Sequence, residues 1–161
     1  MRTIKLTFWF LSMTITASAL AQSGANCESV GGAILTNFLD QTTTLGSATG
    51  DLKGGLGVTV IDPIVQGSSP GSLLFHNRHR WVTEAGDTIV FDDAFALAFP
   101  TGVPGLYAAS YTNGVTITGG TGRFMGANGK LAVYGAVNQN NGHVILRYEG
   151  QVCFQPVTSR P

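Results

Sequence analysis

Apolar and polar residues alternate in short segments along most of this chain, and glycine, proline, serine or asparagine separates one segment from the next. A period of two is typical of strands with one buried face, and almost no segment has the period of an amphipathic helix. The pattern predicts strands at residues 33–39, 56–61, 73–83, 88–98, 106–112, 115–118, 130–137 and 143–154. We expect the stretch 40–57, which is rich in threonine and glycine, to form a long rim loop or lid.

The number and spacing of these strands predict an all-β domain, built either as a sandwich or as a barrel. Composition agrees, because the 22 glycines are about twice the usual share and valine and threonine are frequent. Residues 22–161 are enough for one domain with a sizeable core.

The first 21 residues have the features of a secretory signal peptide. Arg2 and Lys5 precede an apolar run, and the small residues Ala19 and Ala21 mark a cleavage site. We therefore expect residues 1–21 to be removed and the domain to be secreted, either outside the cell or into a periplasm. The run is too short for a stable membrane span, and we expect no other span in the chain.

The net charge of the chain disfavours nucleic acid as a partner. Without Arg2 and Lys5 the chain has seven basic and nine acidic residues, a formal charge of −2. The sequence also has no basic patch with interleaved aromatic residues, so nucleic-acid binding is disfavoured.

The two cysteines, Cys27 and Cys153, lie near opposite ends of residues 22–161. An isolated pair in a secreted chain predicts a disulfide between them. A reactive or metal-binding cysteine is the alternative, but neither cysteine has a nearby histidine or a CxxC partner.

A hairpin formed by residues 73–83 and 88–98 is predicted to place a polar pair inside the domain. Odd-numbered residues are mainly apolar in both strands, so both odd faces should point inward. A three-residue turn at 85–87 then sets the register. In that register the facing pairs are Trp81 with Phe91, Asn77 with Phe95, and His79 with Asp93.

An inward histidine opposite an inward aspartate is a candidate acid/base pair, because the carboxylate orients the imidazole. His79 and Asp93 are therefore our candidate catalytic residues. We expect Asn77, Trp81, Phe91 and Phe95 to contact a ligand. The alternative is a satisfied core pair that only fixes the register of the hairpin. We expect no metal site, since His76 and His79 are three apart on a strand and point to opposite faces.

The segment 115–129 combines a β-branched run with a cluster of glycines, Gly119, Gly120 and Gly122, followed by Phe124. Such glycines allow positive φ, and we expect Phe124 to be buried at one end of the domain. Residues 119–124 resemble the glycine-rich signature of the allene oxide cyclase and dirigent family. A looser match in strand order covers residues 34–153.

This resemblance implies a single eight-stranded antiparallel β-barrel that holds a small hydrophobic molecule. Members of the family steer cyclisation, isomerisation or coupling of a reactive intermediate without a cofactor. The resemblance thus implies a cofactor-independent cyclase or isomerase. Two alternatives remain open: a barrel that only binds a lipophilic ligand, and a packed structural barrel. A homo-oligomer also remains open.

Overall fold

The computed structural model describes residues 26–155, which form strands and two single-turn 3₁₀ helices. The strands are β1 (Asn26–Phe38), β2 (Thr43–Ala48), β3 (Gly54–Val60), β4 (Val65–Gln66), β5 (Leu73–Thr83), β6 (Thr88–Phe91), β7 (Ala94–Pro100), β8 (Leu106–Tyr111), β9 (Val115–Gly120), β10 (Asn128–Asn138) and β11 (His143–Phe154). The 3₁₀ helices are η1 (Gly50–Leu52) and η2 (Gly122–Phe124). The predicted signal peptide lies outside the described residues.

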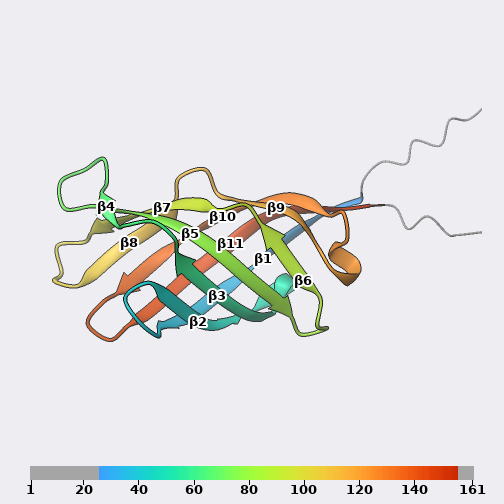
Figure 1. The fold of residues 1–161 in the computed structure, drawn as a ribbon, viewed down its shortest axis with the longest axis horizontal. Coiled ribbons are helices and arrows are strands. Elements are labelled where there is room, and N and C mark those ends of the chain that lie inside the picture. The colour runs from blue at the N-terminus through green and yellow to red at the C-terminus, as the bar shows by residue number, and fades with distance from the viewer. Residues whose placement is uncertain (1–25, 156–161) are drawn as a thin grey trace, which may run out of the picture.

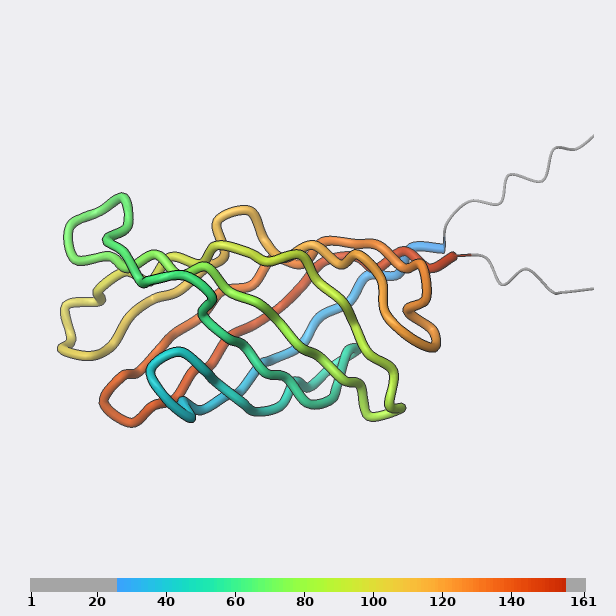
Figure 2. Tube along the Cα trace, in the orientation of Figure 1, coloured from blue at the N-terminus to red at the C-terminus, as the bar shows by residue number. Residues whose placement is uncertain are grey.

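These strands close into an antiparallel barrel (Figures 1 and 2). The barrel has eight strand positions, which we call walls. β6 and β7 together form one wall, and β8 and β9 together form the next. The other six walls are β1, β2, β3, β5, β10 and β11, while the short β4 only pairs with β5. β10 pairs with both β8 and β9, and β11 pairs with β10 and β1, which closes the sheet. The predicted all-β class and eight-stranded barrel are confirmed. No helix within residues 26–155 is long and apolar enough to cross a membrane.

The expected long loop at residues 40–57 is wrong. This stretch contains β2, η1 and the start of β3, and β2 pairs with β1 on one side and β3 on the other. Threonine, serine and glycine dominate β2, so the alternation that identifies a strand is weak there. Its backbone hydrogen bonds to two neighbours place it in the barrel nonetheless.

The predicted register of the central hairpin is also wrong. The structure pairs Trp81 with Ile89 and Asn77 with Ala94. The expected single strand at 88–98 is broken between β6 and β7, where Asp92 and Asp93 leave the ladder. A register shift next to Phe91 marks the same irregularity. An irregularity of this kind re-aims the side chains that follow it.

One end of the barrel is filled by side chains. Tyr148 and Phe124 are almost completely buried, as is Leu52 of η1. The Tyr148 hydroxyl donates to the Thr49 carbonyl at 2.8 Å and accepts the Leu52 amide at 2.9 Å. The Trp81 indole donates to the Leu52 carbonyl at 2.8 Å. Burial of Phe124 at this end confirms the prediction made from the glycine-rich segment.

The connection from β9 to η2 depends on glycine at Gly122. Its φ is +55°, in the left-handed region where a side chain is strained. A Cβ at this position would also overlap with the carboxylate of Asp87. Gly122 therefore allows the chain to turn beside the β5–β6 hairpin and place Phe124 in the core.

A disulfide joins Cys27 of β1 to Cys153 of β11, as predicted from the isolated pair. The two residues face each other in the ladder between these strands. The bond lies near the start of β1 and the end of β11, and these strand ends lie at the same end of the barrel (Figure 1). It therefore ties the first wall of the barrel to the last one.

Candidate functional site

The barrel contains a cavity of about 110 Å³ above its filled end. Trp81 and Leu56 line it near the filled end, while Phe38 and Thr42 line it near the β1–β2 turn. That turn lies at the end of the barrel opposite the start of β1 and the end of β11 (Figure 2). Because Gln41 and Thr42 are both exposed and part of the lining, the cavity reaches the surface at this end.

Most of the lining is aliphatic or aromatic, and none of the lining residues is charged. The apolar residues come from nearly every wall and include Val58, Phe75, Phe91, Val133 and Leu146. The inward positions of successive strands thus form a mostly apolar wall, as period-two alternation predicts. A charged ligand would find no counter-ion inside it.

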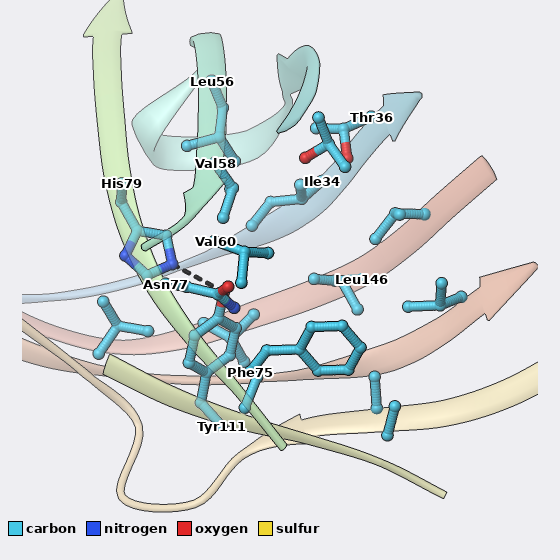
Figure 3. Close-up of a pocket in the computed structure, with 18 of the residues that line it drawn as sticks. Ile34, Thr36, Leu56, Val58, Val60, Phe75, Asn77, His79, Tyr111 and Leu146 are labelled. Atoms are coloured by element: carbon cyan, nitrogen blue, oxygen red, sulfur yellow. Dashed lines mark hydrogen bonds between the residues drawn. The ribbon is translucent and has the colours of Figure 1, made fainter. Parts of the chain in front are cut away.

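Three polar side chains form a hydrogen-bonded cluster in this lining (Figure 3). The hydroxyl oxygen of Tyr111 lies 2.7 Å from Nε2 of His79 and accepts a hydrogen bond from Nδ2 of Asn77 at 3.1 Å. Asn77 and His79 are two apart on β5, so they share its inner face, and Tyr111 ends β8. The three residues therefore come together from two walls of the barrel.

The cluster leaves two buried atoms without a hydrogen bond. Among the buried side-chain nitrogen and oxygen atoms of residues 26–155, these are Oδ1 of Asn77 and Nδ1 of His79. Buried polar groups in proteins are nearly always paired, and an unpaired one is costly. Both atoms belong to residues that line the cavity.

Burial keeps this cluster uncharged. Desolvation lowers the pKa of His79 to about 4, and the nearby Asp93 carboxylate opposes that shift only in part. Desolvation also raises the pKa of Tyr111 above its usual range, although the hydrogen bond from Asn77 acts in the opposite direction. At neutral pH the site is therefore a neutral imidazole, a neutral phenol and an amide.

Four of the six residues proposed as catalytic or ligand-binding lie at the cavity: His79, Asn77, Trp81 and Phe91. Phe91 packs against Trp81 and His79, with ring centroids 5.8 Å apart in each pair. The alternation of residues along β5 and β6 was enough to find this group. The other two residues, Asp93 and Phe95, are not part of the lining.

Asp93 does not form the predicted pair with His79. Its carboxylate accepts two hydrogen bonds from the guanidinium of Arg78, at 3.0 and 2.7 Å, and Arg78 lies on the outer face of β5. This pairing lowers the pKa of Asp93. The chain irregularity at Asp92 and Asp93 turns the carboxylate outward, so it is not the orienting group for the imidazole.

Phe95 lies on the outer surface rather than in the cavity, with 47% of its area exposed. Its ring stacks on His76 with centroids 4.2 Å apart. The one-residue change in register between β6 and β7 reverses which residues of β7 face inward. Ala94, Ala96 and Ala98 are the inward ones, and their small size leaves room for the cavity.

Tyr111 was not selected from the sequence as a site residue. The pairing of Ala96 with Tyr111 shows its direction, because Ala96 is buried on the inner face. That pairing depends on the register of the β7–β8 hairpin, which sequence alternation alone does not specify.

Comparison of the chain with protein-family models, with curated proteins and with solved structures found no significant match.

Proposed function

We propose that this protein binds a compact, largely apolar small molecule in its barrel and steers ring closure, isomerisation or coupling of that molecule without a cofactor. The observation that carries the proposal is the apolar cavity with a neutral polar cluster in its wall. An apolar lining with a few placed polar groups is the usual composition of a small-molecule site.

Folding alone does not favour this arrangement. The apolar side chains around this cavity forgo the packing contacts of a filled core, which costs stability. The unpartnered atoms of Asn77 and His79 add to that cost. A packed structural barrel would gain stability by filling the space with apolar side chains. The cavity therefore favours a catalyst or a ligand carrier over a purely structural barrel.

A carrier that binds the same kind of molecule without changing it is the second candidate. The low pKa of His79 favours it, because a neutral imidazole with a pKa of about 4 is a weak base at neutral pH. Conversion would then depend on how the cavity shapes and orients a molecule that is already reactive, rather than on proton abstraction. Chromatography and NMR of the released molecule separate the two candidates, since a carrier releases its ligand unaltered, whereas ring closure or isomerisation gives a product of the same mass but different structure.

The disulfide supports a place of action outside the reducing cytosol. Bonds of this kind persist in oxidising compartments and are rare in the cytosol. We therefore propose that the chain is exported and acts in an extracellular or periplasmic space.

A pair of variants on β8 tests binding in the cavity. Ala109 lines the cavity, whereas its neighbour Ala108 is exposed on the outer face. Toluene, followed by NMR titration, should bind wild type and Ala108→Phe with equal affinity. Ala109→Phe fills the cavity, and its affinity should fall at least about tenfold. The proposal fails if wild type does not bind toluene, or if Ala109→Phe binds it as well as wild type does.

A further inference from the structure

The polar cluster at the cavity has unmet hydrogen-bonding capacity of both kinds. Its members are the Asn77 amide, the Tyr111 hydroxyl and the His79 imidazole, which is neutral and so carries one N–H and one acceptor nitrogen. Two contacts join the three groups, and Oδ1 of Asn77 and Nδ1 of His79 have no partner. The placement of the shared protons decides which groups remain unmet.

In the first possible arrangement of the protons, the Tyr111 hydroxyl donates to Nε2 of His79. Nδ1 of His79 then carries the proton and is an unmet donor, while Oδ1 of Asn77 is an unmet acceptor. In the second arrangement, Nε2 of His79 carries the proton and donates to the Tyr111 hydroxyl oxygen. The Tyr111 proton is then the unmet donor, and both Nδ1 and Oδ1 are unmet acceptors.

The remaining arrangement exchanges the amide nitrogen and oxygen of Asn77, which are hard to distinguish by position. Tyr111 then donates to the amide oxygen and accepts from Nε2 of His79. Nδ1 of His79 is left as an acceptor, and the amide nitrogen is left as a donor. Each of the three arrangements therefore leaves at least one donor and at least one acceptor without a partner.

We propose that the molecule bound in this cavity is a neutral alcohol, whose hydroxyl group hydrogen-bonds to the Asn77–Tyr111–His79 cluster both as a donor and as an acceptor. This inference rests on the proposed function, because it describes the ligand of the same cavity. A ketone, ether or ester supplies only acceptors, and a hydrocarbon supplies neither kind of group. A carboxylate or amine is disfavoured because no lining residue is charged.

The rest of the lining limits the size and polarity of this alcohol. A cavity of about 110 Å³ is similar to the engineered cavity of about 150 Å³ that binds benzene. Val58, Phe75 and Leu146 surround the cluster with apolar surface. The alcohol is therefore expected to carry its hydroxyl on a single ring or an equally compact hydrocarbon group.

Three probes of nearly equal shape test the inference: cyclohexanol, cyclohexanone and methylcyclohexane. The first donates and accepts, the second only accepts, and the third does neither. Cyclohexanol should bind wild type about tenfold more tightly than cyclohexanone. Equal affinity for these two would overturn the inference, even if all three bind. Failure of all three to bind would instead reject the proposed function itself.

A matched pair of variants assigns the preference to the cluster. Asn77→Leu removes one of the two unpartnered atoms, and Asn37→Leu makes the same change at an exposed position of β1 that does not line the cavity. The preference for cyclohexanol over methylcyclohexane should fall about tenfold in Asn77→Leu and stay unchanged in Asn37→Leu. An unchanged preference in Asn77→Leu would contradict the assignment.

A measurement on wild type covers the case in which Asn77→Leu does not fold. The ¹⁵N chemical shifts of the His79 ring report which nitrogen is protonated and hydrogen-bonded. Saturating cyclohexanol should shift the Nδ1 or Nε2 resonance of His79, and methylcyclohexane should leave both near their free positions. Identical shifts with both probes would overturn the inference.

Discussion

Nε2 of His79 and the hydroxyl oxygen of Tyr111 lie 2.7 Å apart inside the barrel, although the two residues are 32 positions apart in the sequence. The contact joins β5 to β8, and Asn77 of β5 donates a hydrogen bond to the same hydroxyl. It holds a neutral imidazole in a wall that is otherwise mostly apolar. We expect both stability and the proposed ligand recognition to depend on this contact.

The buried imidazole should make the protein less stable as the pH falls from 6.5 to about 4. The folded-state pKa of His79 is about 4, below the value of 6.5 expected in the unfolded chain. In this window the unfolded chain takes up a proton that the folded protein does not, so stability is present above the window and is lost as the pH decreases. The expected contribution is up to about 3 kcal/mol.

Urea unfolding across this pH range, for wild type and His79→Gln, measures that contribution. The variant has no group that titrates at this position, so its free energy of unfolding should decrease less with acidification than that of wild type. Parallel curves for the two proteins would show that His79 is not held neutral by burial.

Removing the Tyr111 hydroxyl should destabilise the fold. Tyr111→Phe leaves Nδ2 of Asn77 and Nε2 of His79 without their partner, at an expected cost of about 1–3 kcal/mol. Tyr134→Phe is the matched control, because the Tyr134 hydroxyl donates to the exposed Glu149 carboxylate rather than to a buried group. Chemical denaturation should separate the two variants, and equal stability would mean that the buried cluster contributes nothing.

A side chain at Gly120 should impair the fold at the filled end of the barrel. A Cβ at this position would overlap with the carbonyl oxygen of Thr88 and crowd Phe124. Gly120→Ala should lower the free energy of unfolding by about 1–3 kcal/mol. At Gly55 the same Cβ meets nothing within 4 Å, so Gly55→Ala should unfold close to wild type. Similar midpoints for the two variants would contradict this reading of the glycine-rich connection.

Loss of the disulfide should be costly, because the bond joins residues separated by 126 positions. The chain-entropy model gives about 5 kcal/mol for a loop of this length. Thermal unfolding of the Cys27→Ser, Cys153→Ser double variant should therefore occur many degrees below wild type. Reductant should lower the wild-type midpoint and leave that of the double variant unchanged. A midpoint of the oxidised protein that equals that of the double variant would refute the estimate.

The barrel was largely predictable from the sequence, because most of its walls alternate apolar and polar residues over long stretches. β5 and β11 are such strands, and their inner faces follow from the pattern. β2 was missed since a strand of threonine, glycine and serine carries little alternation. The isolated cysteines predicted the disulfide, because they have no other partner in the sequence.

The site was only partly predictable, for a geometric reason. His79 and Asn77 follow from the inner face of β5, but their partner depends on registers across the barrel. Two acidic residues, Asp92 and Asp93, interrupt what resembles one long strand, so uniform alternation placed Asp93 and Phe95 on the wrong face. A local break of this kind changes every later pairing and cannot be located from the period alone.

The central claim is that a small apolar molecule occupies the barrel, and a crystal structure with bromobenzene tests it most directly. Anomalous scattering identifies the bromine atom without any assumption about how the ligand lies. The account predicts the strongest bromine peak inside the cavity, between Phe91, Val133 and Tyr111, which all line it. A peak confined to the outer surface, or an empty cavity at saturating bromobenzene, would contradict the account.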